Sequence, residues 1–562
     1  MIIKPNITQT LRNLQRYKQI VLVLMKYGFD DILSRLKFDF YIKLKSTIKL
    51  KHKDTDLKRV TAAHRLRLAM EELGPTFIKL GQILSVRPDL ISVDMVEEFQ
   101  KLQDEVPSFP IDQVHAIIRN QLGESTSKLF KQFDDQPIAA ASIAQAHRAM
   151  TMDGDEVVVK VQRPGISQLI ETDINILSDL ALLIEKYIPE SEFYEPSKIV
   201  EEFARTIRKE LDFVREGRNI DRFSRNFENN ESIHVPKVYW KLTSFQILSM
   251  EYIDGIKASQ ISALDAAGLD RKVIAHNAAI CSLEQMFIHG FFHADPHPGN
   301  IFILDNNVIA PIDYGIMGSI DQELRLALGD LLAAIIKKDT NRILRVFQNL
   351  NIIQTDIDER GLRTELTDFM ERYYRIPLAR LDMRRLINEF IETIKRYKIR
   401  LPADMTMMAK ALIIAEGVGR KLDPEFDFIE LANPYVKRLI LRKLDPRRYL
   451  SDFVDIVDDL EQLIRIFPAE ARSILQKIKK GQLTIKFEHQ RLENLIRDLD
   501  KASNRLSFSL VIASIIIGSS LIVRLDKGPL LFGFPIIGIL GFLIAGLLGL
   551  WLVIAIIRSG NL

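Results

Sequence analysis

The sequence predicts an α+β fold in which short strands are confined to a few stretches between long helices. Residues 133–163 leave the helical spacing and hold an apolar run after the turn at 152–155. Residues 234–256 and 301–312 hold further apolar runs bounded by turn residues. Most of the remaining chain repeats apolar residues at helical spacing, so helices are expected to dominate the fold.

The N-terminal part of the chain is predicted to be helical. Between about residues 8 and 50 apolar positions recur at helical spacing, and Gly28 separates two helices. Residues 55–82 are predicted to form one further helix, whose end carries Lys79 and Gln82. Taken alone, these two residues indicate no more than a helix terminus with a surface lysine.

Charge and cysteine content restrict the partners and the compartment. Residues 1–60 carry 14 Lys and Arg against 5 Asp, a net charge of +9; because the whole chain is +3, the remainder is −6. This near-neutral total does not favour nucleic acid as a partner. The basic N-terminus predicts either attraction to anionic lipid or a solvated helix face. The single cysteine, Cys281, excludes an intramolecular disulfide and is expected in the core.

Residues 133–163 are predicted to form a β-hairpin whose second strand, residues 156–162, carries Lys160. In protein kinases a V-x-V-K strand carries the lysine that contacts the α and β phosphates. The loop before such a strand is expected to be glycine-rich, because backbone N–H groups must approach phosphate closely. Here it is alanine-rich, which permits fairly close approach but restricts the backbone. Its residues are Ala139, Ala140, Ala141, Ser142, Ile143, Ala144 and Gln145.

Residues 194–228 are predicted to form one long helix that carries acidic side chains. Glu210 and Glu216 are six residues apart, so they would project in different directions along a helix. One of them is the expected ion-pair partner of Lys160, and the alternative for both is a solvated helix face. The strands predicted over residues 234–256 follow and end in a hinge-like segment.

The stretch from Phe291 to Gly315 has the spacing of a phosphoryl-transfer site. Asp295 is followed five residues later by Asn300, and Asp313 precedes a Tyr-Gly pair. A base-like carboxylate must face the acceptor, while an amide oxygen and a second carboxylate hold a metal on the phosphates. Two apolar runs between Asn300 and Asp313 predict a hairpin that positions the two metal ligands. The alternative is a polar loop whose acidic residues cap turns.

Two C-terminal stretches have the composition of membrane spans. Residues 507–523 and 528–557 are uncharged and long enough to cross a bilayer. Four glycines in the second stretch would let the two helices approach closely. The alternative is a hairpin buried in a soluble protein. The glycines are Gly538, Gly541, Gly546 and Gly549.

Six motifs together resemble the UbiB family, also called the ABC1 or ADCK atypical kinases. They are KLGQ at 79–82, AAASIAQAH at 139–147, VVVKVQRPGI at 157–166, ELDFVREGRN at 210–219, HADPHPGN at 293–300 and DYG at 313–315. The resemblance implies a bilobal, protein-kinase-like fold that uses ATP and Mg²⁺. Its expected regions are an N-terminal helical extension (1–125), an N-lobe with inserted helices (126–255), a C-lobe (256–440), a helical connector (441–506) and a transmembrane hairpin (507–557).

The resemblance also implies roles for individual residues. Lys160 would pair with Glu216 and contact the nucleotide phosphates, and Asp295 would stand at the catalytic-loop position. The other implied roles are nucleotide contacts at residues 139–145, Glu251 and Ile253, metal binding by Asn300 and Asp313, and a lid in which Lys79 and Gln82 face Glu210 and Asp212. Such a lid leaves little room for a protein substrate, which favours ATP hydrolysis or phosphorylation of a small molecule.

The implied function is a membrane-anchored kinase or ATPase that supports biosynthesis of ubiquinone or a related isoprenoid quinone by ATP-driven handling of lipid precursors. A small-molecule or lipid kinase and a non-catalytic nucleotide-binding scaffold are the alternatives. The expected partners are membrane lipid, isoprenoid quinone precursors, enzymes of quinone biosynthesis and a second copy of the chain. The kinase-like part is expected on the cytoplasmic side of a prokaryotic membrane.

Overall fold

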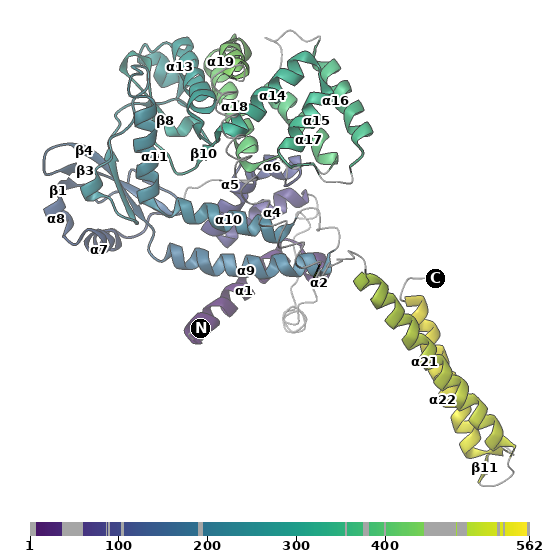
Figure 1. Cartoon of the computed structure of the whole chain (residues 1–562). Helices are drawn as coiled ribbons and strands as arrows, with labels where there is room; N and C mark the ends of the chain where they lie inside the picture. The colour runs from purple at the N-terminus through teal and green to yellow at the C-terminus, as the bar shows by residue number, and fades with distance from the viewer. Residues whose placement is uncertain are drawn as a thin grey trace. The chain divides into compact units, whose positions relative to one another are not determined.

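The computed structural model describes two compact units of the chain, Met1–Arg448 and Tyr449–Leu562. The first holds helices and sheets and the second holds two long apolar helices, so the predicted α+β class is confirmed (Figure 1). The described residues are 7–35, 60–85, 87, 90–102, 106–188, 195–353, 357–374, 382–397, 399, 401–442, 479, 492–524, 529–531 and 534–558.

Helices precede, interrupt and follow the strands of the first unit. The first group comprises α1 (Ile7–Lys26), α2 (Asp30–Arg35), α4 (Ala62–Leu73), α5 (Pro75–Ser85), α6 (Val93–Phe99), α7 (Ile111–Leu122) and α8 (Thr126–Leu129). The second comprises α9 (Ile166–Tyr187), α10 (Pro196–Glu210), α11 (Phe213–Asn226), α12 (Ile261–Ala266) and α13 (Arg271–Leu283). The third comprises α14 (Gln322–Lys337), α15 (Thr340–Asn349), α16 (Glu359–Tyr374), α17 (Met383–Arg396), α18 (Ala403–Leu422) and α19 (Phe428–Arg442).

A five-stranded antiparallel sheet forms the N-terminal lobe. Its order is β1-β3-β4-β5 with β2 added on β3, and the predicted hairpin is confirmed by β3 and β4. Because strand side chains alternate, Val157, Val159 and Val161 are buried towards α7 while Lys160 lies on the opposite face. The strands are β1 (Phe130–Phe133), β2 (Ala139–Ala140), β3 (Ala144–Thr151), β4 (Glu156–Gln162) and β5 (Ile247–Glu251).

The strand predicted at the start of residues 234–256 is wrong. Only β5 and the short β6 (Ile256–Lys257) form there, and residues 234–239 make a single bridge between Val238 and Met250. Pro236 has no N–H to donate to a ladder, which explains why pairing stops. The short helix η3 (Trp240–Leu242) follows.

The single helix predicted over residues 55–82 is also wrong. Its described part consists of α4 and α5, which are separated by Gly74 at φ +95°. Pro75 then begins α5, where its missing N–H needs no partner. Residues 55–59, and the end of the helices predicted between 8 and 50, lie outside the described residues.

The predicted helix over residues 194–228 is two helices, α10 and α11. They meet at Leu211 and Asp212, and the Asp212 carboxylate accepts hydrogen bonds from the N–H groups of Val214 and Arg215. An aspartate at this position caps the start of a new helix, so it ends the preceding one. Glu210 and Glu216 therefore lie on different helices.

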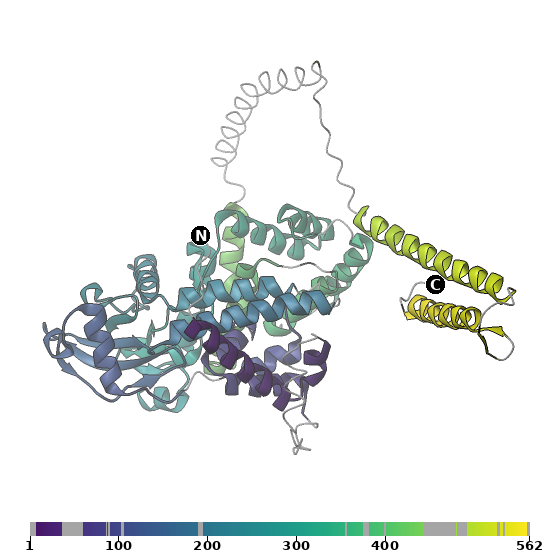
Figure 2. The ribbon, with the colours of Figure 1, turned by 90° about the horizontal axis from the view of Figure 1, so that it is seen from below.

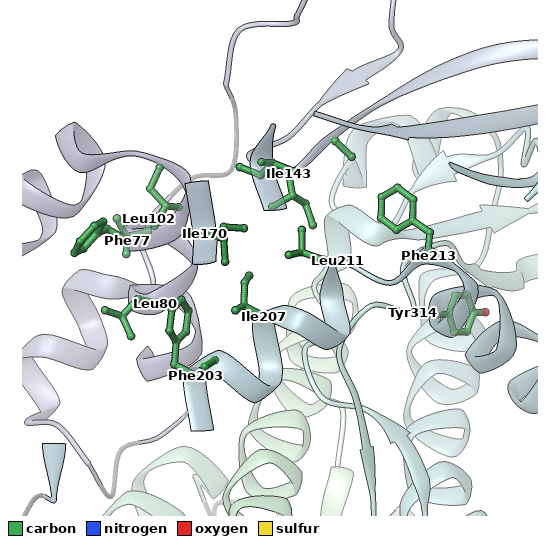
Figure 3. Close-up of a cluster of buried hydrophobic side chains, with 14 of the residues drawn as sticks. Phe77, Leu80, Leu102, Ile143, Ile170, Phe203, Ile207, Leu211, Phe213 and Tyr314 are labelled. Atoms are coloured by element: carbon green, nitrogen blue, oxygen red, sulfur yellow. The ribbon is translucent and has the colours of Figure 1, made fainter. Parts of the chain in front are cut away.

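One apolar core joins the N-terminal helices to the kinase-like lobes. Helices α9 and α10 lie side by side in Figures 1 and 2, and α5 packs against both. Phe77 and Leu80 of α5 belong to the same buried cluster as Phe203 and Ile207 of α10, and Tyr314 lies at its other end (Figure 3). Burial of this kind favours the packing of α5 against α9 and α10 by about 25 cal/mol for each Å² of apolar surface removed from water.

Small sheets in the C-terminal lobe carry the predicted active-site loop. The predicted hairpin between Asn300 and Asp313 is confirmed by β8 (Ile301–Leu304) and β9 (Val308–Pro311), joined by η6 (Asp305–Asn307). Strand β6 pairs with β8, and β7 (Phe291–His293) pairs with β10 (Met317–Ser319). The short helices η4 (Glu284–His289) and η5 (Pro298–Asn300) flank β7. Cys281, in α13, is buried as expected.

The second unit contains α21 (Leu492–Val523) and α22 (Ile536–Arg558). Both are long and apolar enough to cross a membrane, and their apolar windows are only 6% and 11% buried, unlike a soluble core hairpin. Within the uncharged stretch 528–557, the helix begins at Ile536, after β11 (Leu530–Leu531) pairs with β12 (Phe534–Pro535). Gly538 and Gly541 approach α21 closely, whereas Gly546 and Gly549 meet no described atom within 4 Å of a built Cβ.

Candidate active site

The strand lysine and a helical glutamate form a buried ion pair in the N-terminal lobe. Lys160 Nζ on β4 lies 2.6 Å from Glu216 Oε1 on α11, as the resemblance implied. Burial would lower the pKa of Lys160, but the negative charges of Glu216 and Asp313 outweigh it and raise that pKa. The lysine is therefore held as a cation in an enclosed site.

The hairpin of β8 and β9 brings the two predicted metal ligands together. Ile301 pairs with Pro311 in the ladder, and the N–H of Ile312 donates to the backbone oxygen of Asn300 at 3.0 Å. The Asn300 amide nitrogen lies 3.3 Å from Asp313 Oδ2. An amide and a carboxylate thus face the same point, although 13 residues separate them along the chain.

Asp313 is ionised because of its neighbours. Burial would raise its pKa, but the charges of Lys160, His293 and Lys79 and a hydrogen bond from the Gly315 N–H lower it. A buried carboxylate that remains negative suits a hard cation such as Mg²⁺.

Tyr314 stands where a D-F-G-type turn has phenylalanine, and it behaves as an apolar ring. It is fully buried and makes an edge-to-face contact with Phe223 at 5.2 Å between ring centres. Burial raises the pKa of Tyr314 well above its usual value. The backbone oxygen of Tyr314 accepts from the Asn219 amide at 2.9 Å, which ties the turn to α11.

Asp295 lies on the loop after β7 and is half-exposed. The ladder between β7 and β10 ends at His293, and the N–H of Asp295 donates to His293 Nδ1 at 3.1 Å. Its carboxylate Oδ1 lies 3.2 Å from Lys410 Nζ on α18. Sequence reasoning missed Lys410, because no local spacing connects a lysine in a late helix with this loop.

Two of the four residues expected at the lid form an ion pair. Lys79 Nζ on α5 lies 2.6 Å from Glu210 Oε1 at the end of α10, and both side chains are about nine-tenths buried, with 10% and 9% exposed. Gln82 instead donates to the backbone oxygen of Leu102 at 3.3 Å, and Asp212 caps α11. Lys79 thus meets the acidic pair as the resemblance implied, whereas Gln82 and Asp212 make their described contacts elsewhere.

Close packing around position 81 explains why the Lys-x-Gly-Gln helix has a glycine there. A Cβ at this position would lie 2.2 Å from Leu102 Cδ1 and 3.0 Å from Met70 Sδ. The glycine thus lets α5 approach α4 and the end of α6 closely, which is a packing role.

Side chains of the alanine-rich loop point mostly into the protein. Gln145 is buried and exchanges hydrogen bonds with the backbone N–H and oxygen of Phe109, and Ile143 packs in the core of Figure 3. Ser142 and Ala144 are also buried, whereas Ala139, Ala140 and Ala141 are more accessible. The side chains of Ile143 and Gln145 are thus engaged within the protein, and the nucleotide contacts predicted for residues 139–145 would be made through backbone N–H groups.

Side chains of the hinge-like segment also make contacts within the protein. Glu251 Oε1 lies 3.0 Å from His234 Nε2, and Glu251 Oε2 accepts from the N–H of Lys237. Ile253 is buried. Their side chains serve the fold, which leaves backbone groups for any contact with an adenine ring.

The residues present fit ATP and Mg²⁺. Within the described ranges no group of three His, Cys, Asp or Glu side chains could hold a metal by itself. Mg²⁺ commonly binds through one or two carboxylates together with substrate phosphates; here Asp313 offers one carboxylate, and Asn300 offers an amide oxygen beside it. Lys160 supplies the cation for the nucleotide phosphates.

Comparison with known proteins defines the class. The model of the ABC1 atypical kinase-like domain matches residues 101–347, that of the UbiB helical domain matches 366–427, and that of the ABC1/UbiB kinase-like C-terminal domain matches 490–558. The fold and these matches define an atypical, protein-kinase-like protein.

Three relatives show how far the similarity extends. The chain is 34% identical over 551 residues to a Clostridium pasteurianum protein named "Uncharacterized protein in hydrogenase 1 5'region", covering 97% of this chain and 99% of that protein. It is 35% identical to the "Probable protein kinase UbiB" of Xylella fastidiosa, covering 79% and 81%. It is 36% identical to "Protein ACTIVITY OF BC1 COMPLEX KINASE 7, chloroplastic" of Arabidopsis thaliana, covering 80% and 62%. The chain belongs to the ABC1/UbiB family.

Proposed function

We propose that this protein is a membrane-anchored, ATP-dependent enzyme that supports biosynthesis of an isoprenoid quinone. The observation that carries the proposal is the enclosed group formed by Lys160, Glu216, Asn300 and Asp313, with Asp295 on the adjoining loop. The name of the UbiB relatives supports a role with ubiquinone or a similar quinone. Bound Mg²⁺ would neutralise charge on the phosphates during transfer.

Individual residues of the chain supply phosphate binding, proton acceptance and closure of the site. Lys160, oriented by Glu216, binds the phosphates, and Asp295 receives the proton of the acceptor hydroxyl or water. Lys79 and the apolar core around α5 close the site from one side. A site closed in this way favours water or a small acceptor over a protein chain.

The apolar core limits how the lid can move. Because Phe77 and Leu80 share a buried cluster with α10, α5 is not a loosely attached flap. We therefore expect ATP turnover to shift α5 together with α9 and α10, which would present a lipid precursor to partner enzymes. The two apolar helices of the second unit would keep this activity at the membrane, with Arg505 and Arg558 on the cytoplasmic side.

The test is quinone profiling in a deletion strain. Complementation with the wild-type gene should restore the quinone, and Asp313→Asn, shown to be membrane-bound, should not. Normal quinone levels with Asp313→Asn would overturn the proposal. Purified protein given γ-labelled ATP should release free phosphate, and Asp295→Asn should abolish that release. Label in a lipid extract instead of free phosphate would establish the lipid-kinase alternative.

A further inference from the structure

A lysine from a distant helix contacts the catalytic-loop aspartate. Lys410 Nζ on α18 lies 3.2 Å from Asp295 Oδ1, and the two side chains are 15% and 42% exposed. A mostly buried lysine loses considerable side-chain freedom, and it is held beside a carboxylate that is open to the site. The motif that holds Asp295 does not predict this contact, because Lys410 lies outside all six motifs.

Helix α18 is anchored to the strands that present this aspartate. The carboxylate of Asp404 in its first turn accepts a backbone hydrogen bond from Ser319 on β10. Further along, Ala415 and Val418 line a cavity with His293 and Pro296, which flank Asp295. The position of Lys410 is thus defined relative to the loop by contacts on both sides.

The other lysines near the reaction centre act on a different aspartate. The positive charges of Lys160 and Lys79 act on Asp313 instead. His297, on the same loop as Asp295, is exposed, and its Nδ1 accepts from the N–H of Gly299. Among the described residues, the cation in an ion pair with Asp295 is Lys410.

We propose that Lys410 binds the terminal phosphate of ATP and stabilises the phosphoryl group during transfer. The inference rests on the proposed function. In that reaction the acceptor oxygen bonds to phosphorus, the bond from phosphorus to the bridging oxygen breaks, the acceptor's proton passes to Asp295, and ADP leaves with the electron pair. Because the base and the phosphorus share the acceptor oxygen, a cation in contact with Asp295 is adjacent to the transferred group.

With this assignment, residues from two regions of the chain form the active site. Asp295, Asn300 and Asp313 fall within the match to the ABC1 kinase-like domain at residues 101–347. Lys410 falls within the match to the UbiB helical domain at residues 366–427. The helical domain would therefore contribute directly to chemistry, in addition to packing against the lobe.

The test compares two nucleotides that differ by the terminal phosphate. Affinities for a non-hydrolysable ATP analogue and for ADP, both with Mg²⁺, are measured by calorimetry on full-length protein in detergent. Lys410→Met should weaken binding of the analogue about tenfold, the size expected for one hydrogen bond to a charged group, and leave ADP binding unchanged. Lys410→Arg should restore most of the difference. Lys421→Met, an exposed position in the last turn of α18, is the matched control.

The other possible results distinguish failure of this inference from misfolding and from failure of the proposed function. Equal weakening of the analogue and ADP, or no change in either, would overturn the inference and leave Lys410 as a structural partner of Asp295. The midpoint of thermal unfolding, measured for every variant, shows whether a loss reflects misfolding, and the Arg variant separates charge from packing. Binding of neither nucleotide by the wild type would instead overturn the proposed function itself.

Discussion

Two buried lysine–glutamate pairs act electrostatically on Asp313, and they differ in what surrounds them. Lys160 with Glu216 and Lys79 with Glu210 have the same separation of 2.6 Å. The first joins a strand to a helix within the kinase-like lobe. The second joins α5 to the end of α10 and is backed by the apolar core of Figure 3. We therefore assign a chemical role to the first pair and closure of the site to the second, although their geometry is similar.

This difference indicates which interactions hold α5 against α10. An ion pair that is largely removed from water gains little net free energy, because desolvation offsets the attraction. The apolar contacts of Phe77 and Leu80 with α10 carry no such cost. We infer that the apolar core holds the lid closed, while Lys79 adjusts the electrostatics of Asp313.

The largest effect should come from breaking the chemical pair. Lys160→Met should lower the rate of ATP hydrolysis by about 10²–10³-fold, since it removes a preorganised cation from the phosphates. It also leaves Glu216 buried without its lysine, so the double variant with Glu216→Gln should recover stability without recovering activity. Phosphate release and thermal unfolding measure the two quantities. Recovery of activity in the double variant would contradict a direct role for Lys160.

The next effect should come from the core beneath the lid. Leu80→Ala should reduce the free energy of unfolding by about 2–5 kcal/mol, because it leaves a cavity in a packed interface. The matched control is Leu182→Ala on α9, whose side chain is 59% exposed. Denaturant unfolding measures both variants. Equal losses in the two would show that α5 is not held by apolar packing.

Removing the lid cation should have a smaller effect that depends on pH. Lys79 helps to lower the pKa of Asp313, whose ionised form we assign to metal binding. Activity should fall as pH decreases through the pKa of Asp313 in the folded protein. Lys79→Met should raise that pKa, so the acidic limb of the profile should move to higher pH, with less than about a tenfold loss at neutral pH. A limb that stays in place would separate Lys79 from Asp313.

The smallest effect should be a gain in stability at Tyr314. The described residues provide no hydrogen-bond partner for its buried hydroxyl. Tyr314→Phe should therefore raise the free energy of unfolding by about 1 kcal/mol and leave ATP hydrolysis unchanged. A loss of activity in this variant would show that the hydroxyl has a partner in the working enzyme.

The sequence predicted the elements whose signals are local. The hairpin that carries Lys160 and the hairpin between Asn300 and Asp313 have clear turns and apolar runs, and both are present. The two apolar C-terminal helices follow from composition in the same way. Two errors arose at Gly74 and Asp212, where a single residue breaks a helix that the apolar period alone would continue, and a third arose at the strand predicted around Pro236.

The sequence by itself determined the fold class, the family and the set of chemical groups, because motif spacing is a property of the chain. Only the tertiary structure decided which groups meet. It separated Glu216 from Glu210, engaged Gln145 and Glu251 in hydrogen bonds within the protein, and brought Lys410 to Asp295. Such contacts depend on how helices pack, and packing is set by side chains far apart in the chain.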